Sequence, residues 1–123
     1  MTGQKQISVS LAEGSILPGE SIHGTVVINY TGRFDSLVIN SQIENSSDIF
    51  YYSNINGKNI KHPYARVSIF KTELDGQTTI VFTATTNHIP ASSHSNVKFR
   101  VSIIQEHKEV AADVVYTKIV GRA

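Results

Sequence analysis

The sequence of 123 residues contains no cysteine, no tryptophan, one methionine and only three prolines. Without cysteine the chain can form neither a disulfide nor a thiolate metal site. A cysteine-free composition suits a reducing compartment, so we expect the protein to be cytoplasmic.

Long apolar runs and a strong charge of either sign are also missing. No run approaches the roughly 20 apolar residues of a membrane-spanning helix. The first residues, MTGQKQISVSL, lack the apolar segment of a secretion signal, and we expect none. The net charge of +1 argues against the basic face with which proteins bind duplex DNA, so no nucleic-acid partner is expected.

The length fits one domain spanning residues 1–123. A chain of this size buries roughly two thirds of its unfolded surface, which is enough for a core without disulfides or metal.

Alternation of apolar and polar residues runs along the whole chain. It predicts strands that each bury one face, and the runs are rich in Val, Ile and Thr, which suit a pleated surface. The last run can supply Val110, Val114 and Tyr116 to one face. The predicted strands cover residues 7–11, 25–30, 37–44, 64–71, 78–86, 97–105 and 109–120.

Turn sequences separate these runs. Asn56-Gly57 and Asp75-Gly76 are common hairpin dipeptides, because both positions tolerate positive φ. Seven to eight mostly antiparallel strands with one apolar face each are best buried as two stacked sheets. The predicted fold class is therefore all-β, an antiparallel two-sheet β-sandwich of the immunoglobulin-like kind.

Two ordered sets of residues within 7–104 resemble the arrestin-like superfamily. The first is a Pro-Gly-Glu turn followed by G-x-V, in LPGESIHGTVVI. The second is a glycine turn, a strand with phenylalanine, then proline, small residues and another strand, in ELDGQTTIVFTATTNHIPASSHSNVKFRV. The matching positions are Pro18, Gly19, Glu20, Gly24, Val26, Gly76, Phe82, Pro90, Ser92, Ser93 and Phe99.

This resemblance implies an arrestin-like sandwich that binds other proteins without catalysis, as do arrestin N-domains, the arrestin-like subunit of retromer and sporulation-control proteins. Those proteins usually carry two such sandwiches in tandem, and 123 residues have room for one. A single domain therefore suggests self-association, such as a dimer, or a separate protein partner.

No catalytic or metal-binding constellation is visible in the sequence. The five histidines, His23, His62, His88, His94 and His107, form no H-x-H or H-x-x-x-H pair, so we expect no metal and no cofactor. His88 and His94 flank one loop and could meet across it. There is no G-x-S-x-G and no Gly-rich phosphate loop, and we expect no enzyme.

Aromatic residues concentrate in the segment from Asp48 to Tyr64. Neighbouring residues of a strand point to opposite sides, so either Tyr51, or Phe50 together with Tyr52, must face outward. Exposed tyrosines are typical of binding surfaces, although the rings could instead cover the open end of the sandwich. The candidate binding residues are Phe50, Tyr51, Tyr52, Lys58, Lys61, His62 and Tyr64.

Three functions remain open from the sequence. The leading hypothesis is an interaction or scaffold module that binds a protein, or a second copy, through a strand edge, the aromatic segment or an arm within residues 108–123. A carbohydrate-binding module is the first alternative, and it requires at least two exposed, coplanar aromatic rings in the 50–64 segment. The second is a small structural protein of a particle or virion.

Overall fold

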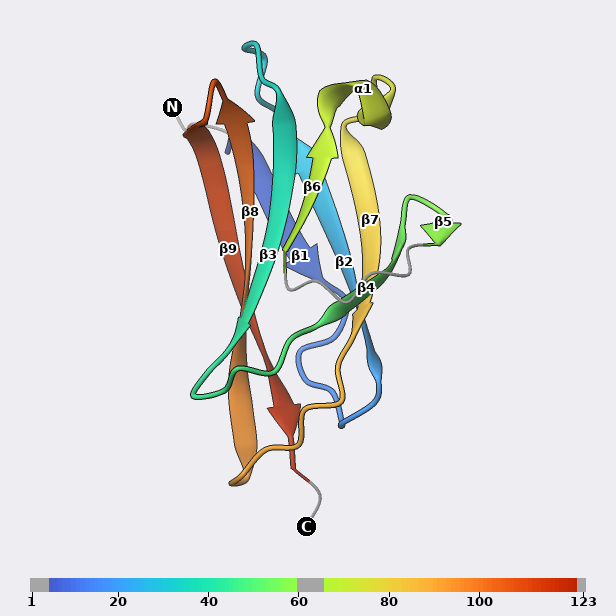
Figure 1. Ribbon diagram of the computed structural model, residues 1–123, viewed down its shortest axis with the longest axis vertical. Helices are drawn as coiled ribbons and strands as arrows, with labels where there is room; N and C mark the ends of the chain where they lie inside the picture. Colours follow the sequence, from blue (N-terminus) through green and yellow to red (C-terminus); the bar gives the residue numbers. More distant parts are fainter. Residues whose placement is uncertain (1–4, 60–65, 122–123) are drawn as a thin grey trace.

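The computed structural model describes residues 5–59 and 66–121, which form two stacked antiparallel sheets (Figure 1). Within these residues there are nine strands and one helical turn. Their bounds are β1 (Ile7–Leu11), β2 (Ser21–Ile28), β3 (Ser36–Ile43), β4 (Tyr51–Ile55), β5 (Lys58–Asn59), β6 (Arg66–Phe70), α1 (Lys71–Leu74), β7 (Thr79–Thr85), β8 (His94–Gln105) and β9 (Lys108–Val120).

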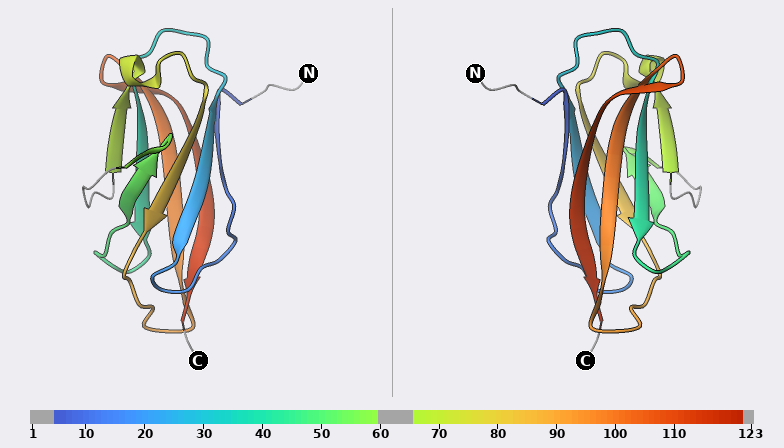
Figure 2. Two further views of the ribbon diagram at one scale, coloured as in Figure 1. Left: turned by 90° about the vertical axis from the view of Figure 1, so that its right-hand side faces the viewer. Right: turned by 90° about the vertical axis from the view of Figure 1, so that its left-hand side faces the viewer.

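One sheet has five strands in the order β1-β2-β7-β4-β5, and the other has four in the order β6-β3-β8-β9. Figure 2 shows the two layers from the side. The predicted β-sandwich is thereby confirmed. The number of strands exceeds seven to eight because the aromatic segment adds β4 and the short β5, which pair with each other and, through β4, with β7.

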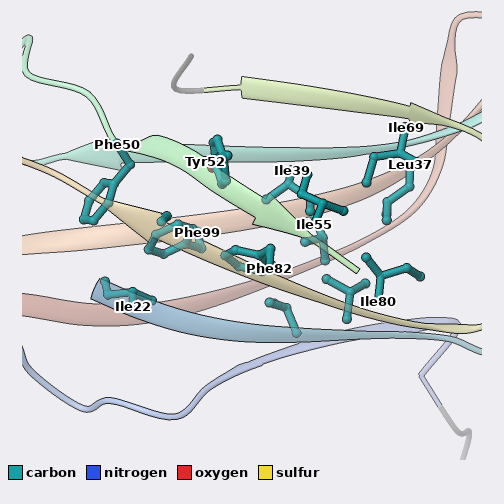
Figure 3. Packing of buried hydrophobic residues seen from close by; sticks show 14 of the residues in the cluster. Ile22, Leu37, Ile39, Phe50, Tyr52, Ile55, Ile69, Ile80, Phe82 and Phe99 are labelled. Carbon is teal, nitrogen blue, oxygen red and sulfur yellow. The ribbon is translucent and has the colours of Figure 1, made fainter. Parts of the chain in front are cut away.

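A chain of four aromatic rings joins the inner faces of the two sheets (Figure 3). The Phe50 and Phe99 ring centroids lie 5.2 Å apart, those of Phe99 and Phe82 5.7 Å, and those of Phe82 and Tyr52 5.9 Å. All four rings are buried, and tilted pairs at these distances contribute about 0.5–1.5 kcal/mol beyond their area. Residues far apart in the sequence thus meet in one core.

The last strand shows which of its faces is buried. Val110, Val114 and Tyr116 lie on the outer face, where Tyr116 is 69% exposed, while Ile119 is fully buried. β9 carries apolar residues at both odd and even positions, so alternation alone cannot select the inward set. A register shift in the β8–β9 pairing, at Ile103/Ile104, complicates the pattern further.

Both predicted hairpin dipeptides adopt positive φ, but only one makes a hairpin. Asn56 and Gly57, with φ of 50° and 84°, join β4 to β5 as expected. Asp75 and Gly76, with φ of 50° and 77°, end α1 instead and lead the chain from β6 into β7 of the other sheet. The hairpin prediction is wrong there because a helix C-terminus uses the same left-handed conformation.

The sandwich is closed along the side where β1 and β9 meet. The Asp113 carboxylate of β9 accepts hydrogen bonds from the Val9 amide of β1, at 3.0 Å, and from the Lys5 ammonium, at 3.1 Å. Farther along, the Ile16 amide donates to the Lys118 carbonyl at 3.0 Å and the Ile16 carbonyl accepts from Val120 at 2.8 Å. The C-terminal strand is therefore built into the sandwich and is not a free arm.

Asp113 should couple this closure to pH. Burial alone would raise its pKa, but the hydrogen bonds from the Val9 amide and from Lys5 outweigh it, so the pKa lies below the ordinary value. A depressed carboxyl pKa stabilises the fold above about pH 4 and loses that effect as the pH falls through the folded-state pKa. Asp113→Asn should therefore unfold more easily than the parent at pH 7 and differ less from it at pH 2.

Urea unfolding from pH 7 to pH 2 measures this difference. Asp75→Asn is the control, because the Asp75 side chain makes no hydrogen bond within the described residues, and it should follow the parent at every pH. A difference between Asp113→Asn and the parent that stays constant with pH would contradict the coupling.

Gly24 of β2 makes room for the central aromatic ring. It lies opposite Phe82 of β7, and a Cβ atom at Gly24 would overlap the ring of Phe82. The ring cannot move aside because it packs against Tyr52 and Phe99. Gly24→Ala should therefore destabilise the protein by about 1–3 kcal/mol in denaturant unfolding.

Gly14→Ala is the matched control, since a Cβ there meets nothing within 4 Å, and it should stay within about 0.5 kcal/mol of the parent. Combining Gly24→Ala with Phe82→Leu should cost less than the sum of the two single changes. Strict additivity would show that the overlap is not the cause.

Candidate functional site

The structure separates the predicted binding residues. Phe50 and Tyr52 are 0% and 1% exposed, so they are core residues and cannot contact a ligand as they stand. Tyr51 faces outward at 36% exposure, and Lys58 is exposed on β5. The other three candidates, Lys61, His62 and Tyr64, lie outside the described residues.

Tyr51 points outward because its neighbour Tyr52 points into the core, where the Tyr52 hydroxyl has a partner. The Tyr52 hydroxyl forms a hydrogen bond with Ser41 of the opposite sheet, which satisfies it inside the core. Burial raises the pKa of this hydroxyl far above its ordinary value despite that bond. Among the three aromatic residues of this segment that the structure describes, one alone is exposed.

A groove opens between the two sheets on the side opposite β1 and β9. We call it the open-side groove; its volume is about 380 Å³, and it lies between the β4–β5 hairpin and the β6–α1 segment. Ile55, Ile69 and Leu74 supply buried apolar side chains to its floor. Lys58 stands on the hairpin wall, and Glu73 and Asp75 stand on the α1 wall. Among the described residues, Asn56, Asn59, Val67, Ser68 and Gln77 also line it.

Hydrogen bonds hold the walls of the open-side groove in place. The Asn56 side chain accepts from the Val81 amide at 2.9 Å and donates to Gln77 at 2.8 Å, which fixes the hairpin to β7. The Glu73 carboxylate accepts from the Phe70 amide at 2.9 Å and caps the start of α1. The groove is therefore formed before any partner binds.

A second cluster surrounds His88, which is buried in the β7–β8 connection. Its Nδ1 lies 2.7 Å from Asp48 Oδ2 and 3.3 Å from Ser46 Oγ, and its Nε2 lies 2.8 Å from Ser95 Oγ. A carboxylate can only accept, so Nδ1 donates to Asp48, and in a neutral imidazole Nε2 then accepts from Ser95. His94, the partner suggested by the sequence, contacts Ser93 instead.

The His88 cluster has the nitrogen assignment of a Ser-His-Asp triad but a different setting. Ser95 belongs to the regular strand β8 and has no strained backbone, whereas a nucleophile is usually presented on a sharp turn. The Asp48 side chain is 58% exposed, and its hydrogen bond with His88 lowers its pKa below the ordinary value. The arrangement suits a clamp between two connections and β8.

Sequence reasoning missed the His88 cluster because Asp48 lies 40 residues away, on the β3–β4 connection. Only pairing β8 with β3, and β4 with β7, brings the two connections together. Tyr51 borders a hollow of about 240 Å³ beside Asp48 and His88. Tyr51 therefore lies near the His88 cluster, whereas Lys58 lines the open-side groove.

The described residues contain neither a cluster of metal ligands nor a membrane-spanning helix. Within residues 5–59 and 66–121, no three His, Asp or Glu side chains gather as metal ligands; His23 pairs with Glu13 alone, at 2.6 Å. No helix in the same residues is long and apolar enough to cross a membrane.

Comparison with known proteins identifies the fold. No family model and no curated protein matches the sequence. The human F-spondin reeler domain matches with a TM-score of 0.56 and 15% identity, over 99% of this chain and 93% of that chain. A conjugative transposon lipoprotein of Bacteroides eggerthii matches with a TM-score of 0.52 and 8% identity, over 94% and 98%.

The N-terminal domain of a Streptococcus gordonii adhesin also matches, with a TM-score of 0.52 and 10% identity, over 94% of this chain and 32% of that chain. The shared feature is the β-sandwich. At these identities the likeness concerns the fold alone, and the arrestin-like resemblance stays a prediction.

The clamp interpretation of the His88 cluster predicts an inert serine. The whole chain should not react with a fluorophosphonate, and Ser95→Ala should hydrolyse p-nitrophenyl acetate as slowly as the parent, because the hydroxyl lies on a regular strand. Intact-mass spectrometry checks labelling, with a serine protease as the positive control. Stoichiometric labelling at Ser95 that His88→Gln abolishes would contradict the clamp.

Proposed function

We propose that this protein is a non-enzymatic interaction module that binds an extended segment of a protein partner in the open-side groove. One observation carries the proposal: hydrogen bonds close the sandwich along β1 and β9, whereas the described residues of the opposite side form a groove with an apolar floor. Concave apolar sites with a few fixed polar groups are typical binding sites.

The strand β6 supplies the edge for such a partner. It is the end strand of the four-stranded sheet and, within the described residues, pairs only with β3. An extended segment can add to a free edge through main-chain hydrogen bonds while alternate side chains enter pockets. Beside β6, those side chains would meet Ile55, Ile69 and Leu74.

The charges on the two walls of the groove favour one orientation of the bound segment. Glu73 and Asp75 lie at the α1 wall and Lys58 lies on the hairpin wall. A partner with apolar residues at alternate positions, and a basic residue next to α1, complements this distribution.

The arrestin-like kinship and a cytoplasmic location are part of the same proposal. Gly24 and Phe82 are two of the residues that carry the resemblance, and they are in close contact in the core. This contact joins the two resembling motifs and supports the arrestin-like proposal. The cysteine-free sequence supports a reducing compartment. An adhesin domain among the similar folds supports a binding role over catalysis.

Peptide binding tests the proposal. Ten-residue peptides selected from a random library against the whole chain should carry apolar residues at alternate positions and shift the amide resonances of β6 and the β4–β5 hairpin. N-methylation of two alternate peptide amides should weaken binding more than about tenfold, because each lost main-chain hydrogen bond costs roughly 1 kcal/mol. N-methylation of the intervening amides should change binding little.

The charge distribution has its own matched pair of variants. Asp75→Asn should weaken binding of a basic-ended peptide, whereas Glu106→Gln, which removes one negative charge from the β8–β9 turn outside the lining of the open-side groove, should not. Peptide binding that is insensitive to N-methylation at every position, or that maps to the outer faces of the sheets, would overturn strand addition.

A further inference from the structure

The outer face of the four-stranded sheet carries rows of mostly polar side chains over β3, β8 and β9, adjacent strands in Figure 1. The pairing aligns Gln42 with Lys98 and Lys98 with Tyr116, which makes one row across three strands. The row on one side combines Glu44, Asn96 and Lys118, and the row on the other combines Asn40, Arg100 and Val114.

The middle of these rows is hollow. A shallow, open depression of about 370 Å³ lies among Gln42, Glu44, Asn45, Asn96, Lys98 and Tyr116, and a smaller one of about 90 Å³ continues toward Arg100. We call the larger one the outer-face hollow. It lies on the four-stranded sheet, away from the lining of the open-side groove.

Tyr116 gives the outer-face hollow an aromatic side. Tyr116 is 69% exposed although burial of apolar area would favour covering its ring, and the polar residues Lys98 and Gln42 line the hollow with it. An exposed aromatic ring among planar amides presents an apolar plane for C–H groups and hydrogen-bonding groups beside it. Sugars offer both, because a pyranose ring has an apolar face and a rim of hydroxyls.

Two polar residues of the outer-face hollow hold each other in place, and other polar residues of the hollow are available to a ligand. Asn96 donates to the Glu44 carboxylate at 3.2 Å, and the Glu44 amide donates to the Asn96 carbonyl at 2.9 Å, so both residues are held in place. Within the described residues, the side chains of Gln42, Asn45 and Lys98 form no hydrogen bond or ion pair. Donors and acceptors for hydroxyls are therefore available without breaking internal contacts.

One carboxylate, Glu44, and one ammonium group, Lys98, line the outer-face hollow, and Glu44 already accepts a hydrogen bond from Asn96. Arg100 is paired with Glu109 at 2.5 Å, whereas Lys98 is half-buried and has no carboxylate partner within the described residues. Lys118 adds a second positive charge from the neighbouring row. A carboxylate that enters the outer-face hollow would complete an ion pair with Lys98, which a neutral sugar cannot do.

We propose that the outer-face hollow binds an acidic oligosaccharide, with Tyr116 stacked on a sugar ring and Lys98 paired with a uronate carboxylate. The fixed Glu44–Asn96 pair and Gln42 bind its hydroxyls. This site differs in place and in ligand from the open-side groove, so either proposal can fail without the other.

Titration calorimetry of the whole chain with a galacturonic acid tetrasaccharide tests the site, with the neutral galactose tetrasaccharide as the comparison. We expect the acidic sugar to bind more tightly, and Tyr116→Ala to weaken it roughly tenfold. Lys98→Met should abolish the preference for the acidic sugar and keep the weaker binding common to both. Added salt should weaken binding of the acidic sugar and leave binding of the neutral sugar unchanged.

Tyr51→Ala is the matched control, because it removes an exposed tyrosine from the outer face of the other sheet, and it should bind like the parent. Thermal unfolding of each variant confirms that the sandwich is intact. Absence of saturable binding by the parent, equal affinity for the two tetrasaccharides, or equal losses in Tyr51→Ala and Tyr116→Ala would each overturn the proposal.

Discussion

The contact between the two sheets, made by Phe50, Phe99, Phe82 and Tyr52, is the constraint on which the other features depend. Inward alternation commits one face of each long strand to this layer. What remains for recognition is the two outer faces and the edges of the sheets. Gly24, opposite Phe82, belongs to the same constraint, because a side chain there would overlap the Phe82 ring.

Strand alternation was enough to predict the sandwich, since β2 and β7 each have one clearly apolar face. It was not enough for β9, where valines occupy both faces and tertiary pairing decides which face is buried. Dipeptide chemistry located the positive φ at Asp75 but not the helix end that uses it.

Candidate sites were harder to predict than the fold. The aromatic segment drew attention by composition, yet two of its rings complete the core and Tyr51 alone of the described three faces outward. The open-side groove, the His88 cluster and the outer-face hollow each combine residues from at least three strands or connections. In the His88 cluster and the outer-face hollow, some members are 40 or more residues apart, and no local pattern links Asp48 with His88 or Gln42 with Tyr116.

The bridge between Ile16 and Ile119 has a mechanical consequence. The two segments run parallel, and their two hydrogen bonds connect the first part of the chain to its last strand. A force that pulls the chain apart from its two ends would therefore load both bonds at once, in shear, rather than opening them one after another. A sandwich built in this way resists extension along its length better than one whose terminal strands can be peeled off singly.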